Sequence, residues 1–331
     1  MRVPINAFLR PIMKRFGKSR FSFLRDRFII NTLMDRFFHL PQNVSSCLRK
    51  TRLSNCDAYI IDPPMSKPKR SILYIHGGAM CFSMWKFYVP IAYKLAVRTG
   101  SRLLLPDYRL APENPFPAGV EDSLESLRWV SENWSDPEDT VIVGDSAGGN
   151  LALNLAIDAT KLRGLVLMSP WLDLTHSSKW MTINDSDDIV HPEAALRAAW
   201  LYVMGGKDWS FGRKDSGNVA LFENALNNPS VSPLFGDISA LAKQTPILLQ
   251  ASSTERLFGD SSALWDRISG EGPDLCDRVG KLPVKLSHSN HLFSIWPDVP
   301  HVWQISRMWT KEAKDAHEEI IKFINQSYSS T

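Results

Sequence analysis

The chain has 331 residues, of which 44% are hydrophobic and 22% charged, and its formal net charge is +3. These values are typical of a globular protein with a sizeable core, and they argue against a largely disordered chain. The small net charge also argues against a nucleic-acid partner, because proteins that bind nucleic acids usually carry a pronounced basic excess.

The first 40 residues differ from the rest in charge, since they hold nine Arg or Lys residues against only Asp26 and Asp35. Apolar residues recur among them at roughly helical spacing, as at Phe8, Ile12 and Phe16. A basic amphipathic stretch either packs its apolar face on the body of the protein or lies weakly on an anionic membrane surface. We expect the first, with residues 1–50 as an N-terminal helical cap segment; membrane-surface contact through residues 1–40 is the alternative.

The sequence shows neither a membrane-spanning segment nor a secretion signal. No apolar run approaches the ~18 residues that a transmembrane helix needs, and the N-terminus lacks the apolar core of a signal peptide. Cys47, Cys56, Cys81 and Cys276 form no Cys-x-x-Cys pair and do not cluster with histidines. We therefore expect reduced thiols, no metal site and a cytoplasmic protein.

From about residue 50, short β-rich runs alternate with helical patterns, which is typical of a mostly parallel sheet with helices on both faces. Several of the β-rich runs are nearly continuous Ile, Val and Leu, as in strands that are buried on both sides. Strands are predicted over 57–61, 71–75, 103–106, 141–143, 164–168, 246–250 and 292–296. Helices are predicted over 87–98, 120–132, 149–159, 261–268 and 311–324.

The alternation breaks between Trp171 and about Ser232, where a helical piece near 193–204 is followed by a polar loop. Insertions of this kind between two strands commonly fold over a site. We therefore expect one catalytic domain built from residues 51–174 and 231–331, with residues 175–230 as a cap insertion.

Residues 144–149, Gly-Asp-Ser-Ala-Gly-Gly, join a predicted strand directly to a predicted helix. A Gly-x-Ser-x-Gly sequence between a strand and a helix is the context of a nucleophile elbow. Side chains at Gly144 or Gly148 would collide with the neighbouring strand or helix, and the strained turn lifts the hydroxyl of Ser146 clear of the sheet. Ser146 is therefore the candidate nucleophile.

Two backbone regions are candidates for stabilising the oxyanion that such a nucleophile forms. The N–H of Ala147 lies at a predicted helix N-terminus. Gly77 and Gly78 follow a buried strand and can present free N–H groups, as the corresponding loop of α/β-hydrolases does. His76 precedes these glycines at the strand end, and we expect it to brace the loop by a hydrogen bond rather than to act as a base.

Together the two motifs resemble the hormone-sensitive-lipase-like family of α/β-hydrolase esterases, which pairs a His-Gly-Gly loop with Gly-Asp-Ser-Ala-Gly-Gly. The segments 106–113, 169–171 and 232–235 also look similar, so the resemblance covers roughly residues 55–325. It implies an α/β-hydrolase fold with a helical cap and hydrolysis of short- to medium-chain carboxylic esters through a serine acyl-enzyme. It implies a small ester as substrate and no cofactor, and family habit alone suggests a homodimer.

The general base is sought among the histidines that follow the acid, because chain order in this fold is Ser, then Asp or Glu, then His. His301 follows a predicted strand and a proline-bounded loop, and the resemblance places the base in the sequence Pro-His-Val-Trp-Gln at 300–304. His291 is the rival. His317 falls in the C-terminal helical pattern, where we expect a solvated surface role.

The resemblance assigns the triad acid to Glu255, after the strand predicted over 246–250. The surrounding pattern is eroded, since Gly259 stands where the family usually has an acid. Asp260 is the rival, and its other interpretation is a helix N-cap or a surface residue.

Ser146, Glu255 and His301 thus predict a serine carboxylesterase. One alternative is a catalytically silent ligand-binding protein of the same fold. Others use the same triad: an amide or N-acetyl hydrolase, or a lipase that acts at lipid interfaces.

Overall fold

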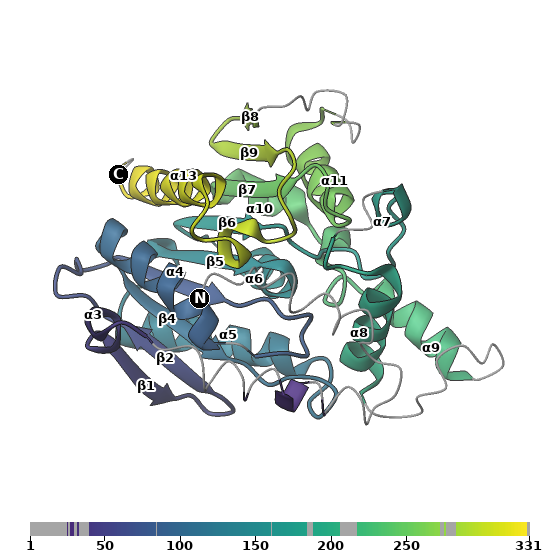
Figure 1. The fold of residues 1–331 in the computed structure, drawn as a ribbon, viewed down its shortest axis with the longest axis horizontal. Coiled ribbons are helices and arrows are strands. Elements are labelled where there is room, and N and C mark those ends of the chain that lie inside the picture. Colours follow the sequence, from purple (N-terminus) through teal and green to yellow (C-terminus); the bar gives the residue numbers. More distant parts are fainter. Residues whose placement is uncertain are drawn as a thin grey trace.

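The computed structural model describes residues 25, 27–29, 32, 40–83, 85–159, 161–183, 188–205, 217–271, 275 and 283–329. Within these ranges a nine-stranded sheet runs through the centre of the molecule in the order β1-β2-β4-β3-β5-β6-β7-β9-β8 (Figure 1). The strands are β1 Leu48–Arg52, β2 Asp57–Ile61, β3 Ser71–Ile75, β4 Arg102–Asp107, β5 Thr140–Asp145, β6 Gly164–Met168, β7 Ile247–Ser252, β8 Val284–His288 and β9 His291–Trp296.

The six central strands, β4-β3-β5-β6-β7-β9 in sheet order, are parallel to one another. The pairings at the two edges, β1 with β2, β2 with β4 and β8 with β9, are antiparallel. Every residue of the central strands β3, β5, β6 and β7 is buried. Their Ile, Val and Leu runs therefore pack against helices on both faces, as predicted. The parallel register brings the carboxyl ends of β5, β6, β7 and β9 to one edge.

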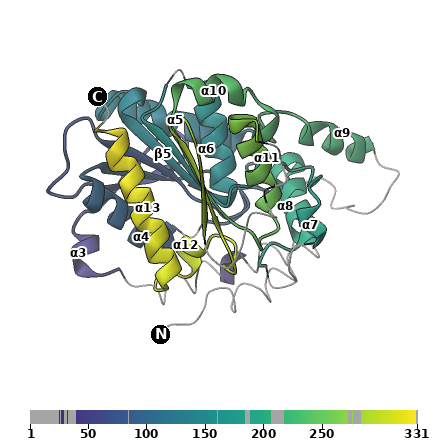
Figure 2. The ribbon, with the colours of Figure 1, turned by 90° about the horizontal axis from the view of Figure 1, so that it is seen from above.

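Helices cover both faces of the sheet (Figure 2). One face carries α4 Trp85–Thr99, α12 Trp303–Ser306 and α13 Lys311–Ser327, whose apolar residues share one buried cluster with β2–β7. The other face carries α5 Ala118–Asn133, α6 Ser146–Asp158, α10 Ile238–Gln244 and α11 Phe258–Ser269, which share a second cluster. The short α3 Gln42–Ser45 precedes β1, and the 3₁₀ turns are Pro137–Asp139 and Pro233–Phe235.

A third apolar cluster joins the helices of the insertion to the loops at the edge of the sheet. These helices are α7 Trp180–Ile183, α8 Pro192–Met204 and α9 Gly217–Leu226, and they stand together beyond α11 in Figure 1. Ala198, Trp200 and Leu201 of α8 are buried in this cluster with Phe82 and Ala147. The inserted helices are thus packed directly on the loop that follows β3 and on the first turn of α6.

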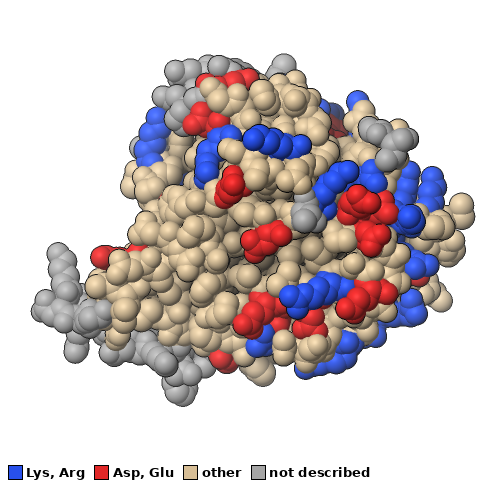
Figure 3. Space-filling model, turned by 180° about the vertical axis from the view of Figure 1, so that it is seen from behind, with Lys and Arg blue, Asp and Glu red and all other residues tan. Residues whose placement is uncertain are grey.

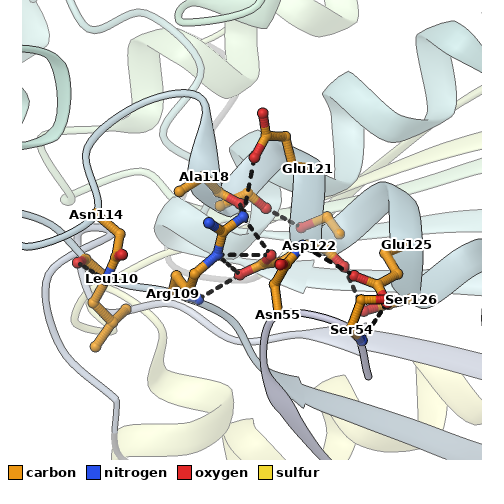
Figure 4. Close-up of polar contacts among 12 residues, drawn as sticks. Ser54, Asn55, Arg109, Leu110, Asn114, Ala118, Glu121, Asp122, Glu125 and Ser126 are labelled. Carbon is orange, nitrogen blue, oxygen red and sulfur yellow. Dashed lines mark hydrogen bonds and ion pairs between the residues drawn. The ribbon is translucent and has the colours of Figure 1, made fainter. Parts of the chain in front are cut away.

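The segment after β4 is held to α5 by an ion pair between a half-buried arginine and a buried aspartate. Arg109 donates to the carboxylate of Asp122 through its backbone N–H (2.7 Å), its Nε (3.0 Å) and a terminal nitrogen (2.8 Å), and Asp122 is fully buried. The same guanidinium reaches Glu121 at 3.0 Å (Figure 4). These contacts fasten the chain that leaves β4 to the first turns of α5.

Predictions for residues 1–40 lie almost wholly outside the described residues. Arg27 is described, and it donates to the carbonyls of Cys81 (3.4 Å) and Ala111 (3.2 Å) and pairs with Glu113. This basic residue therefore contacts the body of the protein. The predicted boundary at residue 50 falls inside a strand, because β1 begins at Leu48 and pairs with β2.

Acidic and basic side chains lie interspersed on the face of the molecule seen in Figure 3, which agrees with the small net charge. Among the helices that are described, none combines the length and the apolarity needed to cross a bilayer.

Candidate active site

Ser146 stands at the junction of β5 and α6 with a φ of 50°, in the left-handed region. The flanking glycines are required by close backbone approach, as predicted. A Cβ on Gly148 would lie 2.1 Å from the Ile75 carbonyl oxygen, and one on Gly144 would lie 2.4 Å from that of Gly148. The tight packing of β5, α6 and β3 thus holds the serine in a conformation that costs energy.

The structure brings Ser146, His301 and Glu255 into one hydrogen-bonded line. His301 Nε2 lies 3.0 Å from Ser146 Oγ, and His301 Nδ1 lies 2.8 Å from Glu255 Oε2. Because an ionised carboxylate can only accept, the proton belongs on Nδ1, and Nε2 is free to accept from the serine hydroxyl. His301 and Glu255 are both buried, so water does not compete for this pair.

The loop that carries Glu255 is tied to the loop that carries His301. Ser252 Oγ donates to the Val299 carbonyl at 2.5 Å, and the Ser253 N–H donates to the Trp296 carbonyl at 2.9 Å. The Ser252 N–H donates to Glu255 Oε1 at 3.1 Å, which orients the carboxylate. Acid and base are thus positioned as a unit, although they lie 46 residues apart.

Burial opposes protonation of His301, but the hydrogen bond and the charge of Glu255 outweigh it and raise the pKa of the imidazole above its usual value. Asp188 and Asp145 add to this effect through their charges. A base with a raised pKa holds the proton it takes from the serine more firmly, which favours proton transfer.

Asp260 does not contact His301 in the described residues. Its Oδ2 accepts from the N–H groups of Leu172 (2.7 Å) and Asp173 (2.9 Å), in the segment that follows β6. Burial raises the pKa of Asp260 to about 8. This residue fastens the chain after β6 to α11, which is a structural role. It lies inside α11 and not at its N-cap, which is Leu257.

The rival histidines lie elsewhere. His291 begins β9, whereas His301 follows the end of that strand. His317 was predicted to be solvated, but it is buried. Its Nε2 lies 2.7 Å from the Gln304 carbonyl oxygen. Burial lowers the pKa of His317 to about 4.

The loop after β3 departs from the prediction at Gly77. Its N–H donates to Asp145 Oδ1 at 3.1 Å, so it is not free for an oxyanion, and the N–H groups of Gly78 and Ala147 are left as the candidates. Gly78 lines the pocket with a φ of 117°, and a Cβ there would lie 2.3 Å from the Phe82 carbonyl oxygen. His76 braces the loop as expected, since its Nδ1 lies 2.7 Å from the Gly77 carbonyl oxygen.

Asp145 is a site residue that the sequence did not reveal. Besides the Gly77 N–H, it accepts from the hydroxyls of Tyr74 (3.2 Å) and Tyr88 (3.3 Å). Burial raises its pKa to about 7. Its place beside Ser146 at the end of a wholly buried strand was the available signal, because an acid there must find buried donors.

A cavity of about 130 Å³ opens beside Ser146 and His301. Its walls are mostly apolar and come from the loop after β3, from α4, from α12 and from the insertion. They include Gly78, Ala79, Phe82, Phe87, Tyr88, Ile189, Val190, His191, Ala194, Ala195, Ala198, Leu257, Val302, Ile305 and Ser306. Residues 189–191 and the alanines of α8 form the side that the insertion contributes. Across the described ranges, no three His, Cys, Asp or Glu side chains gather as metal ligands would.

Comparison with known proteins extends these observations. A family model described as "alpha/beta hydrolase fold" matches residues 72–276. An esterase of Acinetobacter venetianus is 30% identical over 300 residues, covering 89% of this chain and 87% of that protein. The esterase LipU of Mycobacterium tuberculosis is 32% identical over 271 residues, 80% of each chain. A solved esterase of the bacterial hormone-sensitive lipase family aligns over 99% of both chains with a TM-score of 0.73 at 27% identity.

Proposed function

The chain belongs to the hormone-sensitive-lipase-like esterases of the α/β-hydrolase family and is a serine carboxylesterase, and we propose that Ser146, His301 and Glu255 form its catalytic triad. The observation that carries this assignment is the continuous line from Ser146 Oγ through His301 to Glu255. A protein that only bound a ligand would have no need of this alignment.

In the proposed acylation step, His301 Nε2 accepts the hydroxyl proton as Ser146 Oγ attacks the ester carbonyl carbon. The tetrahedral intermediate collapses when the imidazolium returns that proton to the leaving alkoxide, which departs as an alcohol. Glu255 remains ionised throughout; it fixes the tautomer of the ring and stabilises its positive charge.

The negative charge on the carbonyl oxygen is stabilised by backbone N–H groups, for which we propose those of Gly78 and Ala147. Ala147 is the first residue after the nucleophile and begins α6 together with it, so the helix dipole contributes to the stabilisation. The Gly77–Asp145 hydrogen bond supports this assignment indirectly, because it holds the loop that presents Gly78 against the elbow.

Deacylation repeats the sequence with water as the nucleophile. His301 Nε2 takes a proton from the water, the new oxygen–carbon bond forms, and Ser146 leaves as its hydroxyl with the proton that His301 returns. The products are a carboxylic acid and a regenerated enzyme, and the steps need no cofactor.

The cavity supports a short- to medium-chain acyl group. Pockets for drug-sized ligands span roughly 300–1,000 Å³, whereas this cavity has about 130 Å³ and mostly apolar walls. The position of α8 against the cavity supports the assignment of residues 175–230 as a cap that shapes the substrate site.

We would measure hydrolysis of p-nitrophenyl acetate, butyrate, octanoate and palmitate by the wild type and by three single variants, Ser146→Ala, His301→Ala and Glu255→Ala. We expect acetate and butyrate to turn over fastest. Loss of Ser146 or His301 should lower kcat by about 10⁴- to 10⁶-fold, because triad members act as a unit.

His291→Gln is the matched control, since it replaces the rival histidine and should leave kcat within about threefold of the wild type. A folded wild type that is inert on all four esters would refute catalysis and favour the ligand-binding alternative. Full activity of His301→Ala would refute the assignment of the base.

A further inference from the structure

Asp188 lies in the insertion, immediately before the residues that form one wall of the cavity. Ile189, Val190 and His191 line that cavity, and α8 begins directly after them at Pro192. Whatever holds Asp188 therefore also fixes where this wall stands relative to Ser146.

The carboxylate of Asp188 is bound by two backbone donors from different parts of the chain. Its Oδ2 accepts from the N–H of Arg256 at 2.7 Å, and its Oδ1 accepts from the N–H of Val190 at 3.2 Å. Arg256 is the residue that follows Glu255. One oxygen thus reaches the loop of the triad acid, while the other orders the pocket wall.

Arg256 makes a second contact in the opposite direction. Its guanidinium donates to the Met181 carbonyl oxygen in α7 at 2.6 Å. The insertion is therefore tied to this one residue both before and after positions 183–187, by the Met181 carbonyl and by the Asp188 carboxylate.

We propose that Asp188 is a positioning residue for ester hydrolysis: it fastens the cavity wall formed by residues 189–191 to the Glu255 loop and places a second carboxylate beside the His301–Glu255 pair. This inference rests on the proposed triad. It gives the insertion a part in the chemistry in addition to a part in shaping the pocket.

The charges around Asp188 support this role. Within the described part of the chain, the ionisable groups that act on Asp188 are His301 and Glu255. Those that act on His301 are Glu255, Asp188 and Asp145. Burial raises the pKa of Asp188, and the charge of His301 and the two N–H donors oppose that increase. In return, the Asp188 charge helps to raise the pKa of His301.

An aspartate suits this position better than its amide, because each of its oxygens accepts one N–H. An asparagine can accept with its single oxygen only, and it removes the charge. Asp188→Asn therefore loses the electrostatic effect and one of the two contacts, whereas Asp188→Ala loses the charge and both contacts. Glu193→Gln is the matched control, since it neutralises an exposed carboxylate on α8, five residues further along the insertion. Among the contacts described for it, Glu193 pairs only with Arg197.

The electrostatic part is tested without any need for turnover. In a Ser146→Ala background, the imidazole of His301 is titrated by NMR in the parent, in Asp188→Asn and in Glu193→Gln. We expect a lower pKa of His301 with Asp188→Asn and no change with Glu193→Gln. Superimposable titrations of the parent and Asp188→Asn would overturn this part, whether or not the protein hydrolyses esters.

The positional part is tested kinetically with p-nitrophenyl butyrate. Loss of both contacts in Asp188→Ala should raise KM about three- to tenfold through a displaced wall, with kcat changed less than KM. Asp188→Asn should show a smaller rise in KM and an acid limb of kcat/KM at lower pH. A KM for Asp188→Ala equal to that of the wild type would overturn the positional part.

Discussion

The two halves of the active site are held by different forces. On the nucleophile side, Gly144 and Gly148 leave no space for a Cβ, so steric fit within one turn fixes Ser146 between them. On the acid–base side, Glu255 and His301 stand on separate loops that are joined by hydrogen bonds such as Ser252 to Val299.

This difference predicts how each half responds to substitution. Where backbone approaches backbone, a single added methyl group displaces the chain. Where side-chain acceptors hold the loops, an isosteric replacement is tolerated and removal of an acceptor is not. Paired substitutions on the two sides test this distinction.

The largest contrast is expected between two acids on the acid–base side. Glu255→Ala should lower kcat by about 10²- to 10⁴-fold, and it should also cost about 1–3 kcal/mol of stability because the buried Ser252 N–H loses its acceptor. Asp260→Ala should leave kcat of the folded enzyme near the wild-type value. It should cost about 1–3 kcal/mol for each of the two N–H groups, of Leu172 and Asp173, that lose their acceptor. Kinetics and urea unfolding measure both; a catalytic loss at Asp260 equal to that at Glu255 would reopen the choice of acid.

Gly78→Ala probes the steric side near the oxyanion position. The new Cβ would meet the Phe82 carbonyl oxygen at 2.3 Å, so the loop must move and take the Gly78 N–H with it. We expect kcat to fall about 10- to 10³-fold. Gly270→Ala is the control, because Gly270 has a φ of 74° and nothing near its Cβ position; it should cost about 1 kcal/mol of stability and no activity.

Asp260 also predicts how stability depends on pH. Its pKa is raised to about 8 in the folded state, so the folded protein holds this proton more tightly than the unfolded chain does. Its contribution therefore favours folding at low pH and is lost between about pH 4 and pH 8. In Asp260→Asn the free energy of unfolding should fall less steeply as the pH rises. Part of the fall should remain up to about pH 7, because burial also raises the pKa of Asp145 to about 7. Chemical denaturation at pH 5 and pH 8 decides; equal slopes in both proteins would contradict the expectation.

The smallest effect expected is a shift in the pH profile of activity. In the proposed mechanism only neutral His301 can accept the serine proton, and Glu255 raises the pKa of this imidazole. The acid limb of kcat/KM should therefore lie at a higher pH in the wild type than an ordinary histidine would give. It should move to lower pH in the residual activity of Glu255→Gln, and an unmoved limb would assign it to another group.

The sequence predicted what consecutive residues determine. The central strands and the elbow at Ser146 were evident because burial and the glycine spacing leave marks within short windows. The family resemblance supplied Glu255 and His301, which the structure brings together with Ser146.

Two strands were missed, β1 and β8, and both lie at the edges of the sheet. Their burial is slight, because each has only two half-buried residues and none that is fully buried. Only β8 alternates, and its two apolar residues, Val284 and Leu286, are too few to predict a strand. Lys50 and Arg52 of β1 instead form ion pairs with Asp57 of β2. Such strands form through pairing with a neighbour, which a single sequence does not show.

The remaining differences have a common cause in long-range hydrogen bonds. Gly77 looked like a free donor because its partner, Asp145, is 68 residues away. Asp188 looked like part of a polar insertion because its partner, Arg256, is also 68 residues away. Neither contact changes the local pattern of residues, so neither could be predicted from it.

The position of Asp145 has a consequence for how this esterase can evolve. The carboxyl group of Asp145 accepts a hydrogen bond from the Gly77 N–H and so holds that loop. It also accepts one from the hydroxyl of Tyr88, whose side chain lines the cavity. A lineage that replaced Tyr88 to admit a different acyl group would remove a donor from Asp145 and so loosen the loop that presents Gly78. A substitution at Tyr88 would therefore change acyl selectivity and the proposed stabilisation of the oxyanion at the same time. New specificity is more readily gained at the alanines of α8, which line the cavity.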